Sequence, residues 1–272
     1  MKRSIFSWVL VGAFALAGVA LVGCSKTKEG TDAGTEVPSD KNLFSVNGVE
    51  FRMVPVEGGT FMMGASPKEE EFVYGNLSKP AHEVTLSSFS IAETEVTREL
   101  WEAVMGEELP PREDLGPQHP VHKVSLERIL TAFLPKLKEL TGRDFTVPTE
   151  AQWEFAARGG VKSKGFLYSG SDDCNEVASY MYSGDNICPV KAFLPNELGL
   201  YDMSGNVFEF CRSYLGAYTT DPMTDPELPA DAEVYTVRGG GYSSLAEQVL
   251  VCARIGEVSL SNKAGFRLAL KD

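Results

Sequence analysis

The stretch Asn196-Glu-Leu-Gly-Leu-Tyr-Asp-Met-Ser-Gly-Asn-Val-Phe-Glu-Phe210 decides the fold of this chain. It holds two short apolar runs, 198–203 and 207–210, with Gly205-Asn206 between them. A glycine in a tight turn lets the surrounding carbonyl groups converge, because it has no side chain to obstruct them. We therefore expect a compact turn between two short buried segments.

The stretch belongs to a C-terminal half that is rich in loops. Beyond residue 160 helical periodicity stops, and Gly, Asn, Asp, Ser and Pro surround short apolar runs. Long loops that are held by a few short strands are the expected result.

Three helices are predicted before residue 160. Their start signals are Thr97, Ser125 and Thr149, and Gln152 completes a capping box with the last of these. Pro135 lies inside the second helix and is expected to kink or break it. The predicted class is α+β, with short strands, three main helices and a high loop content.

Strand signals lie nearer the N-terminus. Residues 51–64 form two apolar runs around Glu57-Gly58-Gly59, which predicts a hairpin. Residues 82–91 alternate between apolar and polar, which predicts one further strand.

Residues 1–23 have the pattern of a secretory signal. A basic start, Met1-Lys2-Arg3, precedes a nearly unbroken apolar run, Ile5 to Leu21. Cys24 follows Gly23 directly, and this arrangement resembles the lipobox of bacterial lipoproteins, which implies cleavage before Cys24 and diacylation of its thiol. An uncleaved membrane helix is the alternative, because a span needs roughly 20 apolar residues.

The mature chain is predicted to have two parts. Residues 24–42 contain the lipidated cysteine and a polar, flexible tether, and residues 43–272 form one domain, since no repeat or second linker divides them. The expected location is the bacterial cell envelope, with the lipid anchor holding the protein to a membrane. Ser25 favours the outer membrane or cell surface over the inner membrane.

The chain is strongly acidic. It has 25 Lys and Arg against 38 Asp and Glu, which gives a formal net charge of −13. Such a charge repels nucleic acid and anionic membrane surfaces, so no nucleic-acid partner is expected. It is compatible with a bound hard cation, although solubility alone also explains it.

Four cysteines remain besides Cys24. Cys174 and Cys188 flank one irregular stretch and are the first candidates for a disulfide, which an exported location permits. Cys211 and Cys252 each lie in an apolar run, so buried thiols and a bridge both remain open.

Several motifs occur in a recognisable order. They are Met53–Gly64, Glu95-Val-Thr97, Thr141–Gly160, Asn196–Phe210, Val237–Tyr242 and Gly265-Phe-Arg267. This series resembles the formylglycine-generating enzyme, or sulfatase-modifying factor, family from about residue 50 to 270. The resemblance implies a variant of the C-type-lectin-like fold.

The residues that catalyse the family's reaction are absent. Active members oxidise a cysteine of a sulfatase to formylglycine with copper(I) and oxygen, and two closely spaced thiolates hold the copper. The matching window, 239–251, contains no cysteine. Ser243 and Ser244 lie near the position of the first thiol, but hydroxyls are poor copper(I) ligands. Copper is therefore not expected; if the chain is active, Cys252, Ser243 and Ser244 are the candidates.

The resemblance also implies a structural calcium ion. Asp202 and Glu209 would supply carboxylates, and Gly205 and Val207 would supply carbonyl oxygens, which is the mixed oxygen shell that calcium prefers. In the alternative interpretation, Gly205-Asn206 only forms a turn and Glu209 makes a buried hydrogen bond.

Two functions remain open. The first is a lipid-anchored envelope protein that acts as a binding or scaffold module for an envelope protein or a glycan. The second is a formylglycine-generating oxidase, or a related oxidoreductase, with an atypical metal site. The fold cannot decide between them, because one fold can carry many functions.

Overall fold

A computed structural model describes residues 40–73, 77–110, 114–184, 186–214, 216–227, 235–256 and 264–271. The predicted signal, Cys24 and the tether up to residue 39 lie outside these residues. Residues 39–272 form one compact unit. None of the described helices is both long and apolar enough to cross a bilayer.

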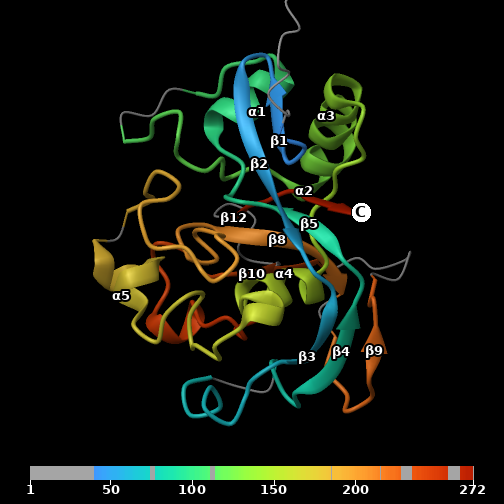
Figure 1. Ribbon diagram of the computed structural model, residues 1–272. Helices are drawn as coiled ribbons and strands as arrows, with labels where there is room; N and C mark the ends of the chain where they lie inside the picture. Colours follow the sequence, from blue (N-terminus) through green and yellow to red (C-terminus); the bar gives the residue numbers. More distant parts are fainter. Residues whose placement is uncertain are drawn as a thin grey trace, which may run out of the picture. The chain divides into compact units, whose positions relative to one another are not determined.

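The described strands form four small sheets (Figure 1). The first has the order β1 (Leu43–Val46), β2 (Val49–Val56), β5 (Phe89–Ala92), β13 (Ala269–Lys271). The second has the order β11 (Ile255–Gly256), β10 (Tyr235–Arg238), β8 (Phe208–Tyr214), β12 (Ala264–Gly265). The third is β3 (Gly59–Met63), β4 (His82–Leu86), β9 (Met223–Thr224), and the fourth pairs β6 (Ala178–Ser179) with β7 (Ser204–Gly205).

The predicted hairpin at Glu57-Gly58-Gly59 is wrong. Strand β2 pairs with β1 and β5, whereas β3 pairs with β4 in another sheet. The chain crosses between sheets at Gly58, where a Cβ atom would lie 2.5 Å from the Leu86 carbonyl oxygen. The glycine is therefore needed for this close crossing and does not form a hairpin turn.

The single strand predicted over 82–91 is also wrong. It divides at Ser87-Ser88 into β4 and β5, which belong to different sheets. The Gly58 N–H donates to Ser88 Oγ at 3.1 Å, so the two crossings are tied together. The polar serines that appeared to continue the alternation mark the point where the chain changes sheet.

The three main helices are confirmed. They are α1 (Arg98–Met105), a continuous run of α2 (Leu126–Arg128), η1 (Ile129–Phe133) and α3 (Leu134–Thr141), and α4 (Glu150–Ala157). The predicted caps are present, including the reciprocal box at Thr149 and Gln152. Shorter helical segments are η2 (Gly160–Lys162), α5 (Cys174–Val177), η3 (Met181–Ser183) and η4 (Ala246–Gln248).

Pro135 does not break the second helix. A π-helical segment, η1, leads into α3, and Pro135 lies in the first turn of α3. Proline has no N–H to donate to the helix. It is tolerated at this position because the wider π turn before it already changes the regular pattern of backbone hydrogen bonds.

An aromatic cluster fills the core beside these helices. The rings of Trp101 and Phe133 stack at 5.0 Å between centroids, and Phe266 meets Phe133 edge-on at 5.2 Å. All three side chains are fully buried. The cluster joins α1 and η1 to the segment before β13.

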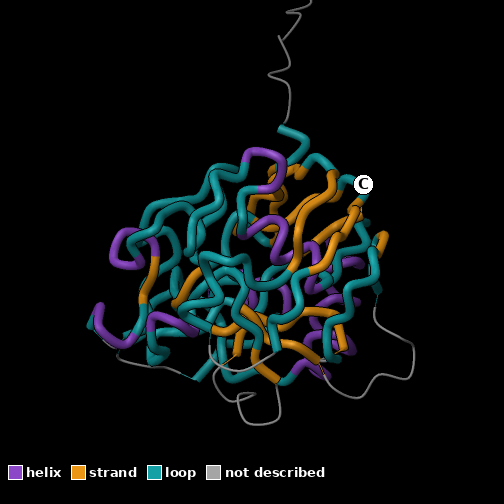
Figure 2. Tube along the Cα trace, turned by 90° about the horizontal axis from the view of Figure 1, so that it is seen from below, coloured by secondary structure: helices purple, strands orange, loops and turns teal. Residues whose placement is uncertain are grey.

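Loops make up much of the remainder. Figure 2 shows loop segments surrounding the short strands on several sides. The α+β class with high loop content is therefore confirmed, and the site depends on how these loops are held.

We expect Phe133→Ala to lower the free energy of unfolding by about 3–5 kcal/mol, because it removes a buried ring and leaves a cavity. Leu140→Ala is the matched control: this residue of α3 is 48% exposed, so its loss should cost less than about 0.5 kcal/mol. Urea unfolding of both variants measures the difference. Equal losses would contradict this account of the core.

Candidate functional site

The turn between Asp202 and Glu209 has an unusual backbone. Asp202, Gly205 and Asn206 all have positive φ angles, of 59°, 84° and 61°. A Cβ atom at Gly205 would lie 2.2 Å from the Ser179 carbonyl oxygen, because β7 runs beside β6 there. Only glycine fits at this position, which explains why the turn is built around it.

Glu209 on β8 is completely paired. Arg267 donates to both of its carboxylate oxygens at 2.6 Å, and Trp153 Nε1 donates to one of them at 2.7 Å. The carboxylate and the guanidinium are both fully buried. The interpretation of Glu209 as a buried hydrogen-bonding group is therefore the one that the geometry supports.

A second buried glutamate holds the turn from the other side. Glu95 accepts from Asn206 Nδ2 at 2.8 Å and from the Val207 N–H at 3.1 Å. Sequence reasoning quoted Glu95 within a motif but gave it no role. A signal was present in the sequence, because Glu95 is an acidic residue between the strand signal at 82–91 and the helix start at Thr97.

The buried carboxylates outnumber their cation. Glu95, Asp202 and Glu209 lie close enough to repel one another, and Arg267 is the guanidinium among them. Burial, followed by the neighbouring Asp202 and Glu209, raises the pKa of Glu95 well above its usual value. Burial also raises the pKa of Asp202 to about 6, although the Lys191 N–H donates to its carboxylate at 2.9 Å.

A divalent cation would complement an excess of carboxylates over cations such as this one. Calcium takes a mixture of carboxylate and carbonyl oxygens, and Asp202, Gly205 and Val207 lie on the turn that would present them. Among the described residues, no three His, Cys, Asp or Glu side chains converge as a metal-binding group. A calcium site here would therefore depend on carbonyl oxygens, since Glu209 is already engaged with Arg267.

The residues named for catalysis do not form one site. Ser244 Oγ accepts from the Gly241 N–H at 3.0 Å, so this side chain closes a turn and is 3% exposed. Cys252 lies in a separate apolar cluster with Ala65 and Leu250. Burial raises the pKa of the Cys252 thiol strongly, so the thiolate that binds copper is disfavoured. Ser243 has an interaction of its own within the fold.

The predicted disulfide between Cys174 and Cys188 is absent from the structure. Both are free cysteines, as are Cys211 and Cys252. Cys174 packs in a small cluster with Tyr180 and Val249, whereas Cys188 Sγ lies 3.8 Å from Ser179 Oγ. The two thiols face different surroundings, although they flank one irregular stretch. For Cys211 and Cys252, the buried-thiol interpretation is the one observed.

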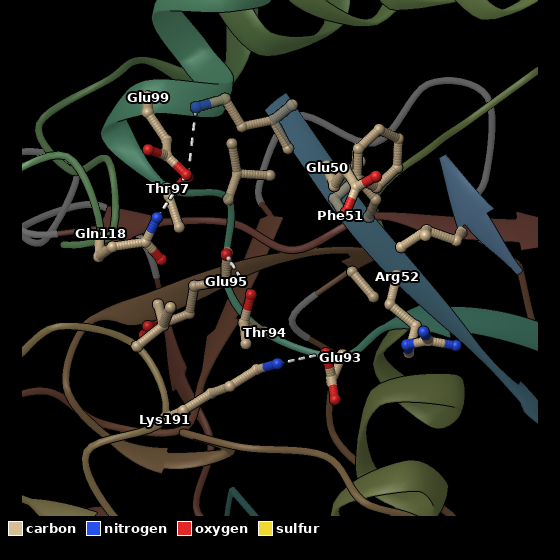
Figure 3. Close-up of a pocket in the computed structure, with 16 residues that line it drawn as sticks. Glu50, Phe51, Arg52, Glu93, Thr94, Glu95, Thr97, Glu99, Gln118 and Lys191 are labelled. Carbon is tan, nitrogen blue, oxygen red and sulfur yellow. Dashed lines mark hydrogen bonds and ion pairs between the residues drawn. The ribbon is translucent and has the colours of Figure 1, made fainter. Parts of the chain in front are cut away.

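A pocket of about 290 Å³ adjoins Glu95 (Figure 3). Its walls include Glu50, Glu93, Glu95 and Glu99 against the cations Arg52 and Lys191. Figure 3 shows Lys191 extended to Glu93, and their charged atoms lie 2.6 Å apart. Even without Glu95, whose pKa is raised, the carboxylates of Glu50, Glu93 and Glu99 outnumber the two cations, so the pocket favours a cationic group over a sulfate or phosphate.

Comparisons with known proteins agree on the family. The model of the sulfatase-modifying factor enzyme 1-like domain matches residues 46–272. The chaperone protein LppX of Paenibacillus barcinonensis is 31% identical over 243 residues, which is 71% of this chain and 79% of that protein. The formylglycine-generating enzyme of Streptomyces coelicolor is 32% identical over 143 residues, and the match covers less than half of either chain, 45% and 46%.

A solved structure has the same fold. Treponema denticola variable protein 1 superposes with a TM-score of 0.72 at 28% identity, covering 85% of this chain and 98% of that one.

We expect acidification to stabilise the calcium-free protein through Asp202. Its folded-state pKa of about 6 is above the ordinary value of 3.8, so folding takes up a proton as the pH falls through this window. The contribution is greatest below about pH 4 and is lost as the pH rises through 6. Melting in EGTA at pH 7.5, 6.5 and 5.5 should show a larger gain for the wild type than for Asp202→Asn. Equal gains in the two proteins would contradict the assignment.

Proposed function

Because the chain belongs to the sulfatase-modifying factor enzyme 1-like family, we propose that it is a lipid-anchored binding module of the cell envelope that has lost the copper oxidase reaction. The observation that carries the proposal is the thiol-free window 239–251. Copper(I) needs soft thiolate ligands, and neither Ser243 nor Ser244 can replace them.

The surroundings of Cys252 support the same conclusion. Burial raises the pKa of the thiol, the carboxylates of Glu69 and Glu154 raise it further, and the guanidiniums of Arg158 and Arg238 offset only part of this. A reactive cysteine instead needs solvent exposure and a lowered pKa. Cys252 therefore has the properties of a core residue.

The proposal includes a location and a kind of partner. The N-terminal pattern around Cys24 supports a lipid anchor in the outer membrane or at the cell surface. One relative is named a chaperone protein, which favours a protein over a glycan as the partner. The match to a formylglycine-generating enzyme keeps an oxidase with an atypical metal site as the alternative.

We expect no conversion of a Cys-x-Pro-x-Arg peptide when residues 40–272 are incubated with copper(I) and oxygen. Mass spectrometry of the peptide gives the readout, and the related Streptomyces enzyme serves as the positive control. Conversion by this protein would refute the proposal. If that activity were lost in Cys252→Ser, the atypical oxidase would be the correct function.

We also propose that the turn at Asp202 binds calcium, on the strength of the buried carboxylate excess. Calcium at about one hundred times its Kd should raise the melting temperature by about 5–10 °C, because it binds only the folded state. Asp202→Asn should lose most of this gain, whereas the exposed-site control Asp221→Asn should keep it. Unchanged melting of the wild type in calcium and in EGTA would refute the site.

A further inference from the structure

The pocket beside Glu95, with a volume of about 290 Å³, is open to solvent at its rim. Leu43 at the rim is 38% exposed, and Glu50 and Gln118 are exposed as well. No lining residue belongs to the thiol-free window 239–251. The pocket is therefore separate from the position of the family's reaction, and a guest can enter it from solvent.

Both cations of the pocket are already paired with carboxylates. Arg52 forms an ion pair with Asp40, and the hydrogen bond between them raises the pKa of Arg52. Lys191 Nζ lies 2.6 Å from a carboxylate oxygen of Glu93. A guest anion would have to break one of these pairs, so neither cation is available to attract it.

Two carboxylates of the pocket have no ion-pair partner of their own. Glu99 accepts a hydrogen bond from Gln118, whose amide is neutral. The Glu50 carboxylate forms no hydrogen bond or ion pair with the part of the chain that the structure describes. Figure 3 shows that the two come from different elements, Glu50 from β2 and Glu99 from α1. With Asp40 and Glu93 included, four carboxylates meet two cations, and a further positive charge would be attracted here.

Apolar side chains form much of the remaining wall. They are Leu43, Ala92, Val96, Leu100 and Val190. A metal ion would need several converging oxygen ligands, and no three His, Cys, Asp or Glu side chains converge among the described residues. An alkyl chain with a terminal cation instead buries its stem on apolar surface and keeps its charge near water. The pocket therefore suits an organic cation better than a metal ion.

We propose that this pocket binds a lysine or arginine side chain of a protein partner. The alkyl stem would lie against the apolar wall, and the charged end would lie near Glu50 and Glu99. A volume of about 290 Å³ is small for a ligand pocket, which suits one side chain and not a larger element of the partner. The inference rests on the proposed binding function and names the chemistry of the partner.

The test uses N-acetyl methylamides of lysine, arginine and norleucine; norleucine keeps an alkyl stem but has no charge. Each is titrated into the ¹⁵N-labelled protein, residues 40–272. We expect saturable shifts at the backbone amides of Thr94, Thr97 and Gln118, which line the pocket. The lysine or the arginine compound should bind about tenfold more tightly than the norleucine compound, equivalent to about 1.4 kcal/mol.

Three outcomes of the titration would overturn the proposal. Equal affinities for all three compounds would remove the role of the charge. Absence of saturable shifts would remove the site. Binding of n-butylamine about tenfold more tightly than the lysine compound would exclude a protein side chain, because the peptide groups would then hinder entry.

A pair of double variants connects the binding to this pocket. Glu50→Gln with Glu99→Gln should weaken binding of the lysine compound about tenfold without changing the melting temperature, since neither carboxylate has an ion-pair partner. Glu83→Gln with Glu139→Gln is the matched control: it changes the net charge equally at two exposed positions outside the pocket, and it should bind as the wild type does. Equal weakening in both proteins would show attraction to the overall charge and would overturn the pocket.

Failure of this inference and failure of the proposed function give different results. Conversion of the Cys-x-Pro-x-Arg peptide by a protein that still binds the lysine compound would refute the function and leave the pocket. No conversion, together with no binding of the lysine or arginine compound, would refute the pocket and leave the function.

Discussion

The ion pair between Glu209 and Arg267 is the interaction on which the rest of the structure depends. Arg267 donates to both carboxylate oxygens and also to the carbonyl oxygens of Ala92 and Tyr201, at 3.0 and 2.9 Å. One guanidinium thus joins the central strand β8 to the end of β5 and to the loop that opens the turn. Removing either partner of a buried pair leaves an uncompensated charge, which typically costs 3–5 kcal/mol.

A second set of buried charges orders the loops around α4. Glu154 accepts from Arg158 Nε at 2.9 Å and from the Gly64 N–H at 2.8 Å, and it also pairs with Arg238. Glu150, on the same helix, pairs with Arg254. The apolar stripe of α4 faces one part of the core while its two glutamates reach loops far away in sequence. A domain with few long strands is held in this way by charge pairs within the core as well as by apolar packing.

The sequence predicted what depends on local signals and missed what depends on long-range contacts. Thr97, Ser125 and Thr149 gave three correct helix starts, since a cap is a contact within four residues. The strand partners of β2 and β3 could not be inferred, because both runs are apolar and only the crossing at Gly58 separates them. Most of the residues at the turn were found through the family resemblance, but Glu95 was not, since it acts from more than a hundred positions away.

The buried ion pairs that build the family fold are present in this chain, and the window 239–251 has no cysteine. The proposed function depends on this separation of the fold from the copper reaction. The most direct test of this separation is a copper(I) titration against a chromogenic chelator, with Cys252→Ser alongside the wild type. The account predicts that neither protein takes copper from the chelator. One tightly bound equivalent in the wild type, lost in Cys252→Ser, would contradict it.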